Sequence, residues 1–182
     1  VSLVSDAGSI LTAEGSSTNV AAGNLRLQAR QAIGTAEKHL TTAVDNLTAL
    51  AEGTAEQGPS TGLYITEDDG LTVTGVAVSV TEFLANPGLT PVTDSSQSDL
   101  VSGNNGNIVL LSNAGNLELN DGSDGEEGTG DGESVSADGS GNILVKTTGS
   151  DTSVIANADI LGSKGHISII GAKDVILNAE AD

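Results

Sequence analysis

The segment Gly141-Asn142-Ile143-Leu144-Val145-Lys146 indicates how this sequence folds, because the same phrase returns along the chain. Its copies share a Gly followed by alternating aliphatic residues, and they begin at Gly23, Gly62, Gly70, Gly106, Gly115 and Gly165. In each copy Gly and Asn favour a turn, and the aliphatic residues then alternate with the period of a short strand. Such a strand is too short to form a sheet alone, so the repetition predicts a repeat protein.

The spacing of the copies predicts coils that contain more than one strand. Gly106 leads to Gly115 nine residues later, and Gly141 and Gly165 lie 24 residues apart, which fits one complete coil. In such a coil two main strands meet at a corner and a shorter third strand follows. Equivalent strands of successive coils stack about 4.8 Å apart. We therefore predict an all-β, parallel β-helix (β-solenoid), in which the Asn residues after the glycines stack as amide ladders.

Residues 35–52 are ambiguous between a helix and strands. Leu40, Val44, Leu47 and Ala51 recur at helical spacing, and the segment contains good helix formers. The alternative is two short strands that meet near Asp45, which the β-branched residues of the segment favour. The period alone favours the helix.

Length and composition indicate one domain with an aliphatic core. The 182 residues are expected to form a single β-solenoid domain (1–182), with loop insertions near 35–61, 85–105 and 121–140. The chain has no Cys, Met or Trp, one Tyr and one Phe. A core of Ile, Leu, Val and Ala suits a narrow interior, where each residue stacks on its equivalent in the next coil.

The charge of the chain excludes several classes of partner. Twenty-five acidic and six basic residues give a formal net charge of −19, whereas nucleic acid and anionic membrane surfaces attract Lys and Arg. No apolar run is long enough to be embedded in a membrane, and no signal-like segment leads the chain. The charge favours solubility, cation binding and an extracellular location. Because the sequence begins at Val1, we expect a processed product or a segment of a longer polypeptide.

Several stretches resemble one known family. The Gly-Asn-Ile/Leu-x-Leu phrases, the run from Ala32 to Ala49 and the stretch from Gly62 to Glu67 resemble repeats of giant bacterial surface proteins of the filamentous haemagglutinin type. The resemblance covers most of the chain except the acidic loop, and the family's N-terminal secretion domain is not visible. It implies a right-handed parallel β-helix, secretion, and a role in adhesion or extracellular structure, with no catalytic residues to carry over. It also implies that Leu40 to Ala49 is extended.

These features predict a non-catalytic structural or adhesive segment of an extracellular bacterial surface protein or filament. The expected partners are flanking repeats of the same chain or further copies stacked end to end, and a receptor on a host or neighbouring cell. Terminal coils of a β-helix expose unpaired backbone and an apolar cross-section. We therefore expect an axial interface formed by Leu3, Val4, Val175, Ile176 and Leu177.

An acidic stretch provides an alternative function, that of a Ca²⁺-dependent binding module. Hard cations prefer clustered carboxylates, and the candidate ligands are Asp121, Asp124, Glu126, Glu127, Asp131 and Glu133. The EF-hand template fails because Gly122 occupies its third position, and the Gly-Gly-x-Gly-x-Asp repeat of another solenoid class is absent. A run of Gly and acids is more often a solvated loop. No cofactor other than this Ca²⁺ is expected.

A carbohydrate-active β-helix enzyme is a third class, with less support. Such an enzyme needs a carboxylate cluster or basic residues on one face, usually beside aromatics, and here the six bases are scattered. Asp68 and Asp69 form a candidate acid–base pair, although a turn before Gly70 explains both residues. His39 and His166 have no partner at metal-ligand spacing. His166 takes the Asn place in its repeat and is expected to form a hydrogen bond at a corner.

Overall fold

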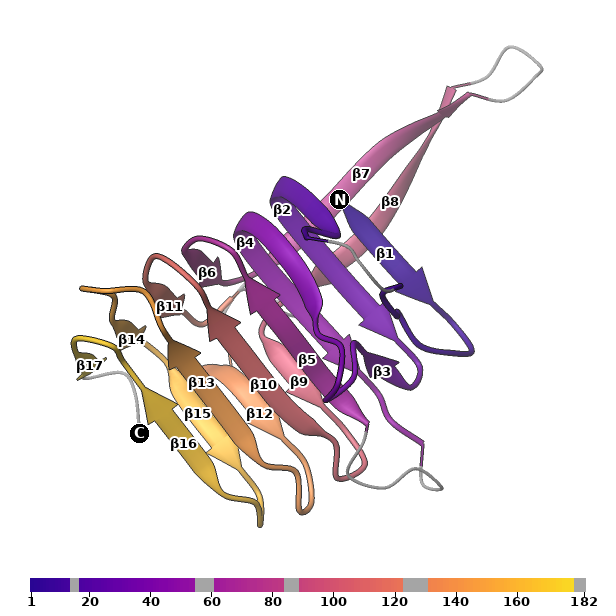
Figure 1. Cartoon of the computed structure of the whole chain (residues 1–182). Coiled ribbons are helices and arrows are strands. Elements are labelled where there is room, and N and C mark those ends of the chain that lie inside the picture. The colour runs from indigo at the N-terminus through magenta and orange to yellow at the C-terminus, as the bar shows by residue number, and fades with distance from the viewer. Residues whose placement is uncertain (14–16, 55–60, 84–88, 123–130, 179–182) are drawn as a thin grey trace.

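The computed structural model describes residues 1–13, 17–54, 61–83, 89–122 and 131–178 (Figure 1). In these parts of the chain all regular structure is β, and no helix is present. Fifteen strands form one sheet, and the two remaining strands pair antiparallel in a separate hairpin. Every pairing within the large sheet is parallel, as the pairs β5–β10, β10–β13 and β13–β16 illustrate. The predicted all-β fold is confirmed, and the architecture is that of a β-solenoid.

The parallel strands fall into three stacks, which we name A, B and C (Figure 1). Stack A contains β3 (Ala32–Ile33), the start of β4 (Leu40–Ala51), β5 (Gly62–Glu67), β10 (Asn107–Ser112), β13 (Ile143–Thr147) and β16 (Ile167–Ile170). Stack B contains the middle of β2 (Val20–Ala29) and of β4, β6 (Leu71–Val73), β11 (Leu117–Leu119), β14 (Val154–Ala156) and β17 (Val175–Leu177). Stack C contains β1 (Ser2–Ser5), the ends of β2 (Val20–Ala29) and β4, β9 (Leu100–Ser102), β12 (Glu133–Ala137) and β15 (Asp159–Gly162).

The ambiguous segment within 35–52 is a strand, as the family resemblance implies and not as its period suggests. β4 runs from Leu40 to Ala51 and pairs along its length with β2. Leu40, Val44, Leu47 and Ala51 are all buried, but they face the core from three different stacks. The helical spacing arises because β4 bends at two corners, and each bend changes which residues point inward.

The pairing of coils confirms the predicted spacing. Ile143 pairs with Ile167, so that Asn142 lies next to His166, 24 residues later. The phrases at Gly106 and Gly141 open stack A, whereas Asn24 pairs with Asn46 at the start of stack B. Gly-Asn marks a corner, and the sequence alone does not distinguish one corner from another.

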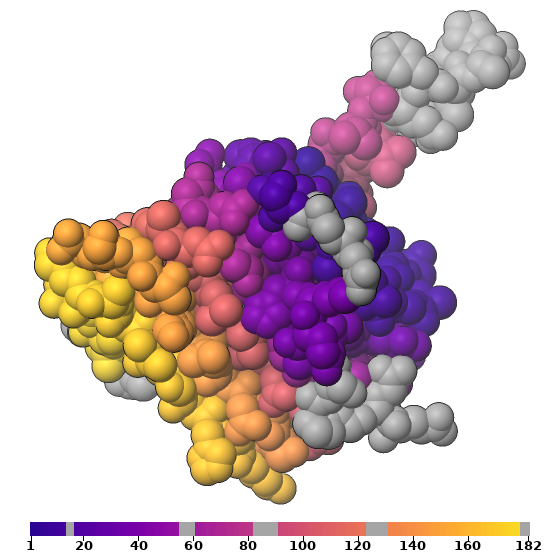
Figure 2. Space-filling model, in the orientation of Figure 1, coloured from indigo at the N-terminus to yellow at the C-terminus, as the bar shows by residue number. Residues whose placement is uncertain are grey.

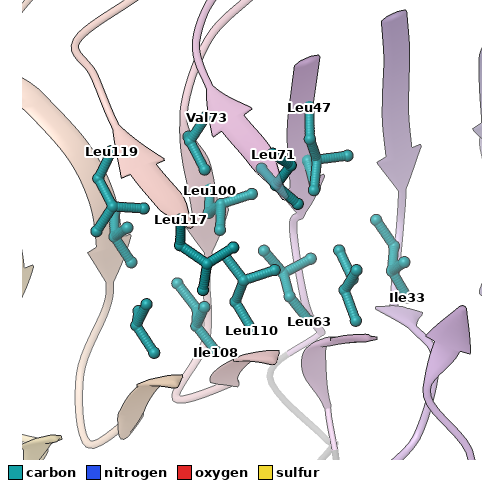
Figure 3. Close-up of a cluster of buried hydrophobic side chains, with 14 of the residues drawn as sticks. Ile33, Leu47, Leu63, Leu71, Val73, Leu100, Ile108, Leu110, Leu117 and Leu119 are labelled. Atoms are coloured by element: carbon teal, nitrogen blue, oxygen red, sulfur yellow. The ribbon is translucent and has the colours of Figure 1, made fainter. Parts of the chain in front are cut away.

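The core is a narrow column of aliphatic side chains from all three stacks. Figure 3 shows Leu63 and Ile108 of stack A beside Leu71 and Leu117 of stack B, with Leu100 of stack C close to them. These five side chains are between 0% and 3% exposed. Each fully buried aliphatic side chain contributes about 1.5–3 kcal/mol to stability, so the column supplies the stability that aromatic residues provide in many globular domains.

Two insertions leave the sheet at the same corner, between stacks B and C. The first is the hairpin of β7 (Val76–Phe83) and β8 (Leu89–Gln97), which projects from the solenoid (Figures 1 and 2). Its second strand lies within the range 85–105 expected to be a loop, and Pro91 is accommodated there because β8 pairs only with β7 in the described residues.

The second insertion separates β11 from β12. β12 belongs to stack C, with Val135 and Ala137 buried, although it lies within the range 121–140 expected to be an insertion. The range 35–61 likewise contains β4, which is part of the sheet. In both ranges buried residues return the chain to the core.

Candidate functional site

In the coil formed by β16 and β17, the side chains that point into the solenoid are not covered by a further coil within the described residues. In the described residues β16 pairs only with β13, and β17 pairs only with β14. Val175 and Leu177 are 44% and 61% exposed, whereas their partners Val154 and Ala156 one coil earlier are 0% exposed. The side chains are equally apolar, so the difference comes from the neighbouring coil, which covers one pair and not the other.

At the opposite end of the solenoid the apolar side chains of the core are more buried. Leu3 and Ile10 are partly buried against the core, and Leu25 is fully buried. The outer edge of β1 is nevertheless unpaired within the described residues, because β1 pairs only with β2.

The register separates the predicted axial residues into two groups. Residues that pair with buried core positions point into the column, and these are Leu3, Val175 and Leu177. Val4 pairs with Gln28, and Ile176 pairs with Ile155, so both point away from the column. The sequence identified the terminal strands but not which face of each strand is turned inward.

A column of buried polar side chains lines the corner between stacks A and B. Its members occupy equivalent positions in successive coils, and they are Thr42, Glu67, Ser112 and Thr147. Ser112 Oγ donates a hydrogen bond to the main-chain oxygen of Asp69 at 2.6 Å, and Thr147 Oγ1 donates to that of Thr152 at 3.2 Å. These bonds satisfy corner carbonyls that have left the sheet. Sequence reasoning missed this column, although a polar residue ends each of these stack A strands from β5 to β13.

Glu67 is the one carboxyl group in this column, and it is fully buried. Thr42 Oγ1 donates to its Oε2 at 2.6 Å, and the N–H of Val44 donates to its Oε1 at 3.1 Å. Burial, and then the neighbouring Asp69 carboxyl, raise the pKa of Glu67 to about 7, although the bonds from Thr42 and Val44 oppose the rise. Glu67 therefore exchanges its proton near neutral pH.

The candidate acid–base pair Asp68 and Asp69 belongs to the turn beside this corner. Asp68 Oδ2 accepts a hydrogen bond from Thr18 Oγ1 at 2.6 Å, and its Oδ1 accepts one from Asn113 Nδ2 at 3.3 Å. The N–H of Asp69 lies 3.4 Å from Glu67 Oε1. These contacts give Asp68 and Asp69 a structural role in the turn at this corner.

Amide ladders run along two corners, and the first is the one predicted for the Asn residues that follow Gly, whereas the second joins Asn residues that follow strands and was not predicted. Asn142 Nδ2 donates to Asn107 Oδ1 at 3.3 Å, and Asn142 Oδ1 accepts the main-chain N–H of His166 at 2.9 Å. This ladder thus ends on the main chain of His166, and the hydrogen bond expected of the His166 side chain stays a prediction. A second ladder joins Asn157 Nδ2 to Asn120 Oδ1 at 2.6 Å and continues to Asn178. These side chains hold successive corners in register.

The base of the hairpin is fixed by a buried arginine and a glutamine. Arg26 Nε donates to the main-chain oxygen of Ser95 at 3.1 Å, and its Nη2 donates to Gln28 Oε1 at 2.8 Å. Gln97 Nε2 donates to the main-chain oxygen of Leu27 at 2.9 Å and to Thr48 Oγ1 at 3.1 Å. The hairpin is therefore attached to β2 and β4 and not only to the coil from which it leaves.

Two open grooves lie on the outward faces of the sheet. One, of about 300 Å³, follows stack B and presents the carboxylates of Asp45 and Glu118 on either side of Thr72. The other, of about 340 Å³, follows stack A, with Val109 and Leu144 beside the first amide ladder. Within the described ranges, no three His, Cys, Asp or Glu side chains gather in a way that could hold a metal ion.

His39 lies apart from both grooves. Its Nδ1 is 2.8 Å from Thr66 Oγ1, its ring lies 5.9 Å from that of Tyr64, and burial lowers its pKa. These contacts give His39 a packing role.

The acidic insertion is described only at its two ends. Asp124, Glu126 and Glu127 lie outside the described residues. Asp121 Oδ2 accepts the N–H of Gly132 at 3.2 Å, and Asp131 Oδ1 accepts the N–H of Glu133 at 2.9 Å. These bonds close the base of the insertion, and the Ca²⁺ site stays a prediction.

Comparisons with family models, curated proteins and solved structures found no match to this chain. The resemblance to repeats of the filamentous haemagglutinin type therefore rests on the sequence phrases. Across the part of the chain that the structure describes, no helix has the length and apolar character needed to cross a membrane.

Proposed function

We propose that this chain is a non-catalytic structural and adhesive segment of a secreted bacterial surface protein or filament of the filamentous haemagglutinin type. Its solenoid continues axially when a further coil pairs with β16 and β17. The observation that carries this proposal is the open coil, in which Val175 and Leu177 of β17 are 44% and 61% exposed, and within the described residues β17 pairs on one edge only, with β14. A right-handed coil is part of the proposal, because connections between parallel strands of one sheet are right-handed in almost all proteins.

The partner coil that we propose is the first coil of a second copy. The outer edge of β1 is unpaired within the described residues, and β1 directs Leu3 into the core column, so it can extend stack C. Each added coil pairs backbone edges and buries side chains that contribute about 1.5–3 kcal/mol when fully covered. Such a head-to-tail contact does not close on itself and would produce a filament. The charge of −19 keeps neighbouring filaments apart.

A single lysine at the open coil tests the stacking. In the monomer Val175→Lys leaves the new side chain partly in solvent, so the fold is kept, but stacking would bury its charge. Burial of an unpaired charge costs several kcal/mol, so association should weaken by at least about 100-fold. Ser168→Lys is the matched control, because Ser168 lies on β16 and is exposed, and it pairs with the outward Leu144.

Sedimentation velocity and electron microscopy of the full chain supply the measurement. We expect elongated assemblies of the wild type and of Ser168→Lys, and monomers of Val175→Lys. Assemblies of unchanged length in Val175→Lys contradict axial pairing. A wild type that stays monomeric at every concentration contradicts the stacking of copies and leaves flanking repeats as the occupant of the open coil.

A further inference from the structure

We propose that the β7–β8 hairpin is a clasp that holds a second copy of this chain. Val80 and Val92 on the hairpin would pack against the corner between stacks B and C at the last coils of the copy stacked on the first coil. This inference rests on the proposed end-to-end stacking, and it assigns to the hairpin a binding surface on that neighbour.

The direction of the hairpin supports this contact. The hairpin leaves the sheet between β6 and β9, passes β4 and β2, and extends beyond the N-terminal coil (Figure 1). In Figure 2 the described part of the hairpin projects from the surface of the solenoid. The hydrogen bonds of Arg26 and Gln97 fix its base along the same corner. A second copy stacked on that end would therefore continue the corner that the hairpin already follows.

The reach of the hairpin fits the level of the junction. The segment from Val76 to Val80 spans about 14 Å at about 3.4 Å per residue, which corresponds to about three coils at about 4.8 Å each. From the coil that carries the hairpin toward the N-terminus, the first corner between stacks B and C belongs to β4 and the second to β2. β1 lies in the third coil. Val80 and its cross-strand partner Val92 thus reach the level at which a neighbour's β17 would complete stack B.

Both surfaces that would meet carry exposed apolar side chains. Val80 and Val92 are 58% and 44% exposed, and at the other end of the solenoid Ile176 and Leu161 are 41% and 39% exposed. Ile176 and Leu161 point outward on either side of the corner between stacks B and C.

The outward column of stack B becomes more apolar toward the last coil, because Thr72 and Glu118 are followed by Ile155 and Ile176. In stack B the apolar outward residues therefore appear at the end where the neighbour's hairpin would lie.

Charged residues on one face of the hairpin test the clasp. The double variant Val80→Asp/Val92→Asp changes only exposed side chains, so the solenoid should fold. We expect its dissociation constant for self-association to rise by at least about tenfold. The control is Ser79→Asp/Thr93→Asp, because these residues form an exposed pair on the opposite face, with their hydroxyl oxygens 2.9 Å apart. The control should associate like the wild type.

The absence of cysteine from the chain allows a direct geometric test. Val80→Cys and Ile176→Cys in the same chain should form intermolecular disulfides on mild oxidation, visible as a ladder on a non-reducing gel, because a disulfide requires Cα atoms within about 7 Å. Val80→Cys with Glu118→Cys should give no ladder, since Glu118 lies two coils away from Ile176.

The outcomes separate the clasp from the stacking on which it rests. If Val175→Lys abolishes association while the hairpin variants associate like the wild type and give no ladder, the clasp is wrong and the stacking stands. If Val175→Lys has no effect, the stacking is wrong, and any effect of the hairpin variants then belongs to another surface. A wild type without self-association overturns both.

Discussion

The guanidinium Nε of Arg26 lies 3.1 Å from the main-chain oxygen of Ser95, although the two residues are 69 positions apart in sequence. Arg26 belongs to β2 and Ser95 to β8, so the bond joins the solenoid to the hairpin that leaves it. Arg26 is 5% exposed, and its Nη1 is buried with no hydrogen-bond partner among the described residues. Among the described residues no carboxylate pairs with Arg26, and a buried charge without such a partner is costly. This position therefore serves the attachment of the hairpin more than stability.

Arg26→Met should loosen the hairpin without unfolding the solenoid. Met fills much of the same space but loses the bonds to Ser95 and Gln28, so amide exchange within 89–97 should accelerate roughly tenfold. The melting temperature should change by only a few degrees, because removal of the buried charge offsets the lost bonds. Hydrogen–deuterium exchange with mass spectrometry provides the measurement.

Arg30→Met is the control for this experiment. Arg30 pairs with Glu52 at 2.8 Å, but the two side chains are 57% and 38% exposed. Exposed pairs contribute little, so exchange in the hairpin should equal that of the wild type. If exchange at 89–97 is the same in Arg26→Met and Arg30→Met, Arg26 does not hold the hairpin.

Because of Glu67, the free energy of unfolding should fall as pH rises, whereas a carboxyl group with a lowered pKa has the opposite effect. Its pKa rises from 4.5 to about 7 on folding because it is buried, so the folded state binds the proton more tightly than the unfolded state. The contribution of Glu67 is fully present below about pH 4.5 and is lost as pH rises through about 7. Its upper limit is on the order of 3 kcal/mol.

Glu67→Gln isolates this contribution. Gln keeps an acceptor oxygen for Val44 or Thr42 and cannot ionise, so the variant should gain stability relative to the wild type as pH rises from 5 to 8. Thermal unfolding at several pH values measures the difference, and Glu118→Gln, at the surface groove on stack B, should follow the wild type. Parallel pH profiles of Glu67→Gln and the wild type would show that Glu67 does not titrate in this range.

Deletion of the acidic insertion tests whether it is a solvated loop or a Ca²⁺ site. The deletion must end before β12, because Val135 and Ala137 belong to the core. A variant that joins Gly122 to Asp131 retains the bond between Asp121 and Gly132 at the base. Its free energy of unfolding should differ from that of the wild type by less than about 1 kcal/mol, because loop length has a small effect.

Ca²⁺ is the second variable in this experiment. For a solvated loop we expect the same melting temperature with and without Ca²⁺ in both proteins. If Ca²⁺ raises the melting temperature of the wild type and not that of the deletion variant, the insertion is a cation-binding module. Magnesium at the same concentration controls for screening of the net charge.

The sequence by itself determined the stacking of short strands into coils. Alternation of aliphatic residues after Gly-Asn predicted the strands, and the 24-residue interval predicted the partner of Ile143. These features are local, since each depends on the turn preference of a few residues and on a side-chain period of two. The amide ladder through Asn107 and Asn142 followed from the same reasoning.

Only the tertiary structure decided which face of each strand points inward and what covers it. Ile176 was predicted to lie at the axial interface but points outward, and Glu67 is buried because Thr42 and Ser112 lie directly above and below it. The attachment of the hairpin to Arg26 likewise joins segments that are distant in sequence. Burial in a solenoid depends on the neighbouring coil, and bends at the corners and insertions of variable length change which residues of neighbouring coils meet.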